Sequence, residues 1–205
     1  MKEVFTEQLH KAWKGLSQMN KVTRMPNVGT DGNTSSRMSV AVKRTSLFAT
    51  IPTYAHEGDA GMDLYASENT VIEPGETDIV PTGIAVAIPK GYELQIRPRS
   101  GLTVKTKLRV QLGTIDCIFR GAIGVIVDNT AEDCGGSTPR LRNLVNKTEA
   151  YDKTYYPKFT YIVSKGDRIC QGVLAPVSHA HFTEVDSLDD SPRGGNGFGS
   201  TGVSE

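Results

Sequence analysis

Apolar and polar residues alternate along Tyr92–Arg97, the pattern of a strand with one buried and one wet face. Similar short runs recur along the chain and are separated by turn sequences such as Pro-Gly at 74–75 and Pro-Lys-Gly at 89–91. They predict strands at 39–42, 69–72, 83–88, 92–97, 108–112, 123–127, 159–163 and 181–185. Many short strands joined by tight turns predict an all-β sandwich, jelly roll or small barrel.

A helical periodicity occurs near the N-terminus. Phe5, Leu9, Trp13 and Leu16 follow one another at spacings of three and four, which predicts an amphipathic helix over residues 2–19. Residues 26–37 are polar and rich in turn formers, as in a linker. We therefore expect an N-terminal helix and linker at 1–37 and a β domain at 38–190.

Two other segments depart from the rhythm of strands and turns. Residues 131–158 are polar and predict a long surface insertion. The C-terminal segment 191–205 is rich in glycine, with five glycines between Arg193 and Gly202. Because each glycine loses much backbone freedom on ordering, we expect an arm that is mobile until something holds it.

Charge and cysteine content exclude several classes. The 205 residues include 23 Lys or Arg and 23 Asp or Glu, so the broad cationic attraction of most nucleic-acid binders is missing. No apolar run approaches the ~20 residues of a membrane span, and the N-terminus lacks a signal peptide's apolar core. Cys117, Cys134 and Cys170 lack any Cys-x-x-Cys pairing, which favours reduced thiols. We expect an intracellular protein, in the cytoplasm or, if a virus encodes it, in the host cytoplasm.

Two carboxylates lie among apolar neighbours. Asp116 lies within 113–121, where a buried carboxylate is costly unless it has a use. A buried general base and a β-turn residue are both consistent with that segment. Asp63, within 60–65, suits either water-mediated Mg²⁺ binding or a turn.

Two segments have the chemistry of phosphate binding. Arg97-Pro-Arg-Ser-Gly101 offers two guanidinium groups, a hydroxyl and a glycine, although a solvated strand end would look the same. In the arm, Gly197-x-Gly199-x-x-Gly202 matches a dinucleotide fingerprint formally, but no βαβ pattern surrounds it. Amides beside Arg193, Ser200 and Thr201 could cradle an anion, and a disordered polar tail is the alternative.

Other reactive side chains carry weaker indications. His179 and His181 would share a strand face at i and i+2, but no third metal ligand accompanies them. Cys170 has no nearby basic activator, which argues against a nucleophilic role.

Taken together, five segments in a fixed order resemble the homotrimeric dUTP diphosphatase (dUTPase) family. The resemblance covers about residues 39–202, and only the stretch between the third and fourth segments is longer than usual. The segments are Ala60-Gly-Met-Asp-Leu-Tyr65, Arg97-Pro-Arg-Ser-Gly-Leu102, Gly113-Thr-Ile-Asp-Cys-Ile-Phe-Arg-Gly121, Lys165-Gly-Asp-Arg-Ile-Cys-Gln171 and Arg193-Gly-Gly-Asn-Gly-Phe-Gly-Ser-Thr-Gly202.

The resemblance implies a jelly roll or distorted β-barrel that assembles as a homotrimer with active sites shared between chains. It implies Mg²⁺-assisted hydrolysis of dUTP to dUMP and pyrophosphate, which limits uracil in DNA and supplies dUMP for thymidylate synthesis. It implies neither membrane attachment nor direct nucleic-acid binding.

Carried over position by position, the resemblance also implies residue roles. Asp116 would be the base that activates water. Uracil would be read by backbone at Gly113, Thr114 and Ile115, with Phe119 against the deoxyribose. The phosphates would contact Arg99, Ser100, Gly101 and Gln171, and Asp63 would help to hold Mg²⁺ through water. In the arm, Arg193, Ser200 and Thr201 would engage the terminal phosphates, and Phe198, followed by Gly199, would stack on uracil.

The sequence departs from the family pattern without losing a catalytic group. Phe119 stands where Tyr is usual, Cys117 and Ile118 replace residues that are often acidic, and Cys170 and Gly172 replace apolar residues. A dCTP deaminase shares the fold family, but its signature is not evident. A dUTPase-like scaffold used for protein binding or regulation is the non-enzymatic alternative.

The 131–158 insertion mixes cations with aromatic residues, as contact surfaces do. A solvated excursion packed on its own subunit is the alternative interpretation. We hypothesise that the insertion is dispensable for catalysis and contacts a protein partner. The mixture comprises Arg140, Arg142, Lys147, Lys153, Lys158, Leu141, Leu144, Tyr151, Tyr155 and Tyr156.

Overall fold

The computed structural model describes residues 38–145, 147–152 and 154–195. The chain divides into two units, residues 1–38 and 39–205, and almost all described residues belong to the second. The helix expected at 2–19 and the linker expected at 26–37 lie outside the described residues.

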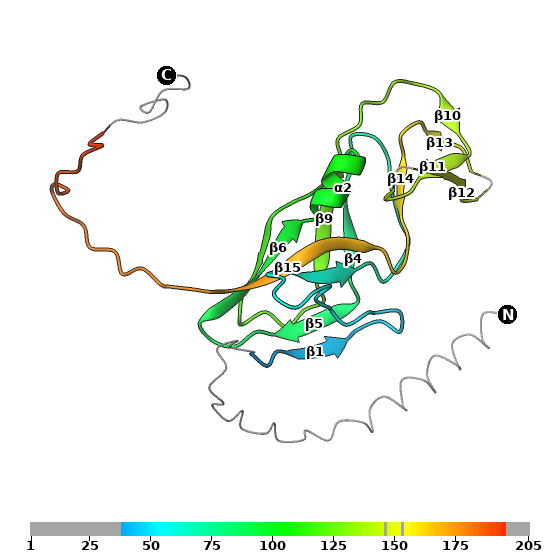
Figure 1. Cartoon of the computed structure of the whole chain (residues 1–205). Helices are drawn as coiled ribbons and strands as arrows, with labels where there is room; N and C mark the ends of the chain where they lie inside the picture. The colour runs from blue at the N-terminus through cyan, green and yellow to red at the C-terminus, as the bar shows by residue number, and fades with distance from the viewer. Residues whose placement is uncertain (1–37, 146, 153, 196–205) are drawn as a thin grey trace, which may run out of the picture. The chain divides into compact units, whose positions relative to one another are not determined.

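Short strands, mostly antiparallel, build the second unit (Figure 1), which confirms the expected all-β class. One four-stranded sheet has the order β2 (Met62–Tyr65), β15 (Arg168–Pro176), β6 (Tyr92–Pro98), β8 (Gly113–Ile115). A second has the order β12 (Thr148–Ala150), β11 (Arg140–Arg142), β14 (Tyr161–Val163), β3 (Thr70–Ile72). A three-stranded sheet has the order β4 (Thr77–Pro81), β9 (Gly124–Asn129), β7 (Leu108–Val110). Two-stranded pairs join β1 (Ala41–Arg44) to β5 (Ile84–Ala87) and β10 (Ser137–Thr138) to β13 (Tyr156–Pro157).

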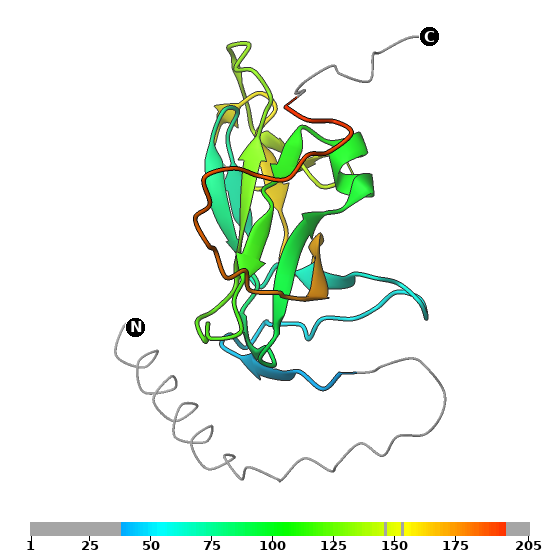
Figure 2. The same cartoon turned by 90° about the vertical axis from the view of Figure 1, so that its left-hand side faces the viewer.

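The three larger sheets and the β1–β5 pair contribute to one hydrophobic interior. Figure 2 shows the same strands after a quarter turn. Leu64, Ile72, Val80, Leu94 and Val125, from five different strands, are all buried in this cluster. Burial of each such side chain stabilises the fold by about 1.5–3 kcal/mol relative to exposure. The alternation seen at Tyr92–Arg97 follows from this packing, because one face of β6 covers the interior.

Strand predictions were confirmed where apolar residues alternate or cluster. The segments 69–72, 83–88, 108–112 and 159–163 each contain a strand, and 39–42, 92–97 and 123–127 overlap β1, β6 and β9. The strand predicted at 181–185 is wrong: the segment is irregular, and His179 and His181 therefore share no strand face. Its Phe182 is 91% exposed. β propensity alone does not produce a strand there, because the side chain has almost no packing surface in its own chain.

The sequence patterns missed one short helix, α2 (Ser100–Lys105), which follows β6 directly. Its six residues are too few to show a helical periodicity. Leu102 is its buried residue and anchors the helix to the core. Among the described residues, no helix is both long and apolar enough to span a bilayer.

The 131–158 segment is more ordered than a surface excursion. It contains β10, β11, β12 and β13, and Leu141 is completely buried. Arg142 pairs in parallel with Tyr161, which extends the sheet beyond β14. The insertion is therefore fixed to the domain by sheet pairing and by a buried leucine.

Candidate active site

A small hollow of about 170 Å³ lies beside the turn that follows β8. Its lining includes Thr114, Ile115, Asp116 and Phe119, residues that the sequence placed together, and continues onto the start of β9. Gly113 lies in β8 opposite Ile96. The third sequence segment thus forms one side of a concave surface with room for a small ring.

Asp116 begins the turn of this segment. Its carbonyl oxygen accepts a hydrogen bond from the amide of Phe119 at 3.0 Å. The side chain is exposed, which corrects the expectation of a buried carboxylate. The turn therefore holds Asp116 in the lining of the hollow, with its side chain open to water.

Phe119 lies over Gly121, and a larger residue at 121 would displace its ring. A Cβ atom at position 121 would lie 2.6 Å from the Phe119 ring. Arg120 braces the same turn, because its Nη1 donates to the carbonyl oxygens of Cys117 and Phe119, both at 2.7 Å. Arg120 was not assigned a role from the sequence. Its position between Phe119 and Gly121 was the signal that could have identified it.

The second cluster of site residues surrounds Asp63 on β2. Asp63 is only 3% exposed, and its Oδ1 lies 3.0 Å from Arg99 Nε. Its Oδ2 lies 3.3 Å from Arg168 Nη1. Arg99 Nη1 also donates to the carbonyl oxygen of Arg168 at 3.2 Å, so one carboxylate ties the first, second and fourth sequence segments together.

This environment does not suit the water-mediated Mg²⁺ role expected of Asp63. Both carboxylate oxygens face guanidinium groups, and the side chain is buried. A cation would have to displace Arg99 and Arg168 or tolerate their charge. No group of three or more His, Cys, Asp or Glu side chains suited to a metal occurs among the described residues. The geometry instead makes Asp63 a residue that positions Arg99.

Replacing Asp63 by Asn is expected to destabilise the fold by about 2 kcal/mol, because a charge-assisted pair is lost. The loss is limited because Arg168 is half-exposed and regains contact with water. Urea unfolding followed by circular dichroism measures the change. Glu68→Gln, which removes an exposed carboxylate, is the matched control. Equal unfolding midpoints for the two variants would contradict the role of Asp63.

The remaining phosphate-site candidates lie beside this cluster. Gln171 pairs with Asp63 on one side and with Arg97 on the other, in the centre of the sheet. Ser100 and Gly101 are exposed at the start of α2, directly after Arg99. Gly61 allows a close approach, because a Cβ there would lie 3.0 Å from Gln171 Cβ.

The two clusters lie far apart in one chain. Ile115 pairs with Leu94, so Asp116 is level with Glu93 near the start of β6. Arg99 follows the other end of that strand, six residues further along. At about 3.3 Å per residue the separation is about 20 Å, too long for both to act on one phosphate.

The arm provides the last candidates. Arg193 is exposed, and near it Gly194 N donates to Ser191 O at 3.0 Å. Phe198, Gly199, Ser200 and Thr201 lie outside the described residues. Arg193 therefore lies in a turn at 192–195.

Cys170 is buried against the Asp63 cluster. Burial, and secondarily the charge of Asp63, raises the pKa of its thiol to about 12. At pH 8 iodoacetamide should therefore modify the exposed Cys134 and leave Cys170 intact, and peptide mass spectrometry reads the two sites separately. Equal modification rates in the folded protein would show that Cys170 is accessible.

Comparison with known proteins identifies the family of this chain. The dUTPase family model matches residues 48–134 and 156–202 and leaves out most of the insertion. Deoxyuridine 5'-triphosphate nucleotidohydrolase of Gloeothece citriformis is 39% identical over 168 residues, covering 81% of this chain and 98% of that protein. Its counterpart from Picosynechococcus is 43% identical over 157 residues, covering 76% and 92%.

Solved structures similar to this chain are also dUTPases. The dUTPase of Staphylococcus bacteriophage 80alpha with dUpNHpp has a TM-score of 0.76 and 36% identity, covering 80% of this chain and 99% of that one. The phage phi11 dUTPase, described with a species-specific insert, has a TM-score of 0.71 and 29% identity, covering 75% and 100%. The five ordered segments, the all-β fold and these matches show that the chain belongs to the dUTPase family.

Proposed function

We propose that this protein hydrolyses dUTP to dUMP and pyrophosphate, the activity for which its relatives are named. The observation that carries the proposal is the hollow beside β8, whose lining includes the exposed Asp116. A base at the edge of a ring-sized hollow can activate water next to the nucleotide that the hollow holds.

Asp116 acts as the general base in this proposal. It takes a proton from a water molecule, whose oxygen attacks the α-phosphorus of dUTP. The bond from that phosphorus to the oxygen bridging to the β-phosphate breaks, and pyrophosphate leaves with the electron pair. Phosphoryl chemistry of this kind depends mainly on positioning and charge neutralisation.

The hollow selects the base and the sugar. Backbone groups of Gly113, Thr114 and Ile115 pair with the edge of uracil, and the confined space leaves no room for the methyl group of thymine. Phe119 packs against the deoxyribose and excludes a ribose hydroxyl. Its ring is held over Gly121, which supports this platform role.

The Asp63 cluster serves the phosphates. Arg99, Ser100, Gly101 and Gln171 contact the triphosphate, while Asp63 holds Arg99 in place from behind. Mg²⁺ accompanies the triphosphate as part of the substrate. A mutant dUTPase of the Staphylococcus aureus phage phi11 coordinates a structural Mg(II) ion.

Each complete site is shared between copies in a homotrimer. The distance of about 20 Å between Asp116 and Arg99, set by the length of β6, supports sharing. A neighbouring copy can bring its Asp116 to the Arg99 of this chain. The arm of another copy, with Arg193, Phe198, Gly199, Ser200 and Thr201, closes over the nucleotide.

A panel of deoxynucleoside triphosphates with Mg²⁺ tests the activity. We expect pyrophosphate from dUTP and far less from dCTP or dTTP. Ammonia from dCTP would indicate a deaminase instead. Absence of turnover with every nucleotide would favour the protein-binding scaffold, an alternative that the named relatives do not favour.

The substrate is a cellular metabolite, which supports a cytoplasmic location, in a host cell if a virus encodes the protein.

The outer side of the insertion is proposed to contact another protein. Val145, Tyr151 and Tyr155 are exposed there, although Leu141 is buried. The variant Tyr151→Ser/Tyr155→Ser should therefore hydrolyse dUTP within a few-fold of the parent, as steady-state kinetics would show. A collapse of activity in an intact trimer would place these tyrosines in the active site instead.

A further inference from the structure

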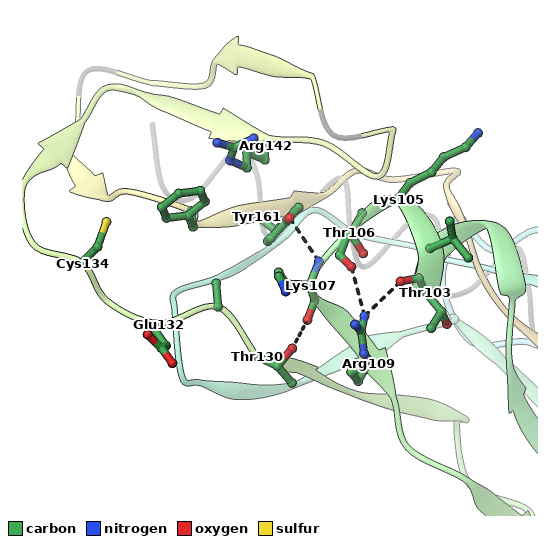
Figure 3. Close-up of a pocket in the computed structure, with 13 residues that line it drawn as sticks. Thr103, Lys105, Thr106, Lys107, Arg109, Thr130, Glu132, Cys134, Arg142 and Tyr161 are labelled. Atoms are coloured by element: carbon green, nitrogen blue, oxygen red, sulfur yellow. Dashed lines mark hydrogen bonds between the residues drawn. The ribbon is translucent and has the colours of Figure 1, made fainter.

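A larger hollow, of about 720 Å³, lies between the end of α2 and the insertion (Figure 3). Thr103 and Lys105 line it from α2, and Arg142 and Cys134 line it from the insertion. It contains none of the residues assigned above to uracil, sugar or phosphate. The hollow is therefore separate from the residues proposed to bind the nucleotide.

The lining of this hollow is cationic. Lys105, Lys107, Arg109 and Arg142 contribute positive charge, and Glu132 is the opposing carboxylate of the lining. The lining also has apolar parts, with the Arg142 guanidinium 4.7 Å from the centre of a phenylalanine ring. Arg109 is fixed in the lining, because its Nη1 donates to three backbone carbonyl oxygens. These features suit an extended acidic peptide with some apolar side chains.

The chain itself contains such a peptide. From Ile169 to Pro192 there is neither Lys nor Arg, while Glu184, Asp186, Asp189 and Asp190 are clustered. Leu188, between these carboxylates, is 85% exposed. Residues 184–190 are irregular, and their apolar residues Val185 and Leu188 are both exposed in the single chain.

We propose that residues 184–190 of one copy dock in the cationic hollow of a second copy. The inference rests on the proposed function, in which the arm of one copy closes the site of another. It adds a place where the arm is held before it reaches the nucleotide. Opposite charges supply attraction, and the apolar parts of the hollow receive side chains such as Leu188.

Chain lengths agree with this docking. Ser100, at the phosphate cluster, and Lys105, at the hollow, lie five residues apart on α2, about 8 Å along the helix axis. Asp190 precedes Arg193 by three residues, about 10 Å of extended chain. Carboxylates seated at the α2 side of the hollow therefore leave Arg193 within reach of Ser100.

The direction of β15 favours a second copy over the same chain. β15 runs antiparallel to β6, and Val177 N donates to Gly91 O directly after it ends. The chain that leads to the arm thus leaves the sheet at the start of β6, whereas α2 follows the end of β6, about 23 Å away. Its own arm would have to turn back along the whole strand.

Cysteine cross-linking tests the docking, because Cys134 already lines the hollow. A Ser187→Cys variant places a thiol within the acidic stretch, and a short bis-maleimide reagent joins thiols that lie close together. We expect covalently linked chains on a denaturing gel. The same variant with Cys134→Ser should lose them, and Ser178→Cys, next to the end of β15, should form few.

The outcomes separate the possibilities. Linked chains that depend on both Cys134 and Ser187→Cys support docking between copies. A cross-link from Cys134 to the introduced thiol of the same chain, identified by mass spectrometry, would show that the arm folds back and would overturn the proposal. Linked chains that persist without Cys134, or no cross-link at all, would overturn it as well.

Charge reversal gives an independent readout. Lys107→Glu should lower the cross-linking yield several-fold, and adding Asp189→Lys should restore it. Lys43→Glu, on the exposed β1, is the matched control and should change nothing. An equal yield in all these variants would show that charge does not guide the arm. Hydrolysis of dUTP is measured on the same samples, so normal turnover without cross-links would reject the docking alone.

Discussion

Replacing Asp116 by Asn is expected to lower kcat for dUTP by about 10²–10⁴-fold, the usual cost of losing a general base. The amide keeps the shape of the side chain but cannot take a proton from water. Because Asp116 is exposed, the fold and its unfolding midpoint should hardly change. Pyrophosphate release under saturating dUTP measures kcat, and equilibrium binding of a non-hydrolysable analogue shows that the site still forms.

Glu68→Gln is a suitable control for this experiment, since it neutralises an exposed carboxylate outside both clusters. It should retain the kcat of the parent. If Asp116→Asn also turned over dUTP at the parental rate, another group would have to be the base.

Removal of residues 193–205 should leave the domain folded and lower kcat/KM by about 10²-fold or more, because the arm's charged and aromatic contacts to the nucleotide are lost together. Among the described residues of this segment, Gly194 bonds only locally, to Ser191. Circular dichroism and size-exclusion chromatography should therefore match the parent. Steady-state hydrolysis of dUTP gives the kinetic loss.

A shorter truncation provides the control for the arm. Removing only residues 203–205 keeps every arm residue proposed to contact nucleotide, so the activity should stay near that of the parent. Near-normal activity in the longer truncation would contradict the proposed closure of the arm.

Strands with a clear apolar pattern could be predicted from the sequence, and strands that depend on partners could not. β6 alternates regularly and was found. β15 was missed although it is central, because Gly172 interrupts its apolar pattern and accommodates Leu94 instead of packing a side chain of its own. β2 contains Asp63, whose burial is tolerable only beside the two guanidinium groups that face it.

The membership of the candidate site could likewise be predicted in part. The order of the five segments identified Asp116, Phe119, Arg99 and Gln171 as site residues. The local sequence could not reveal that Asp63 is paired with Arg168, which is 105 positions further along the chain. Only the register of β2 against β15 brings that pair together, and register between distant strands is set by the whole core.

The central place of β15 also has a consequence for how the chain folds. Its neighbours β2 and β6 are synthesised before it, because β15, which lies between them in the sheet, comes from residues 168–176. Until it arrives, both neighbours present unpaired edges, which are prone to associate with other chains. Contacts between residues so distant in sequence also slow folding. The nascent protein therefore passes through a vulnerable period that lasts at least until residues 168–176 have been made.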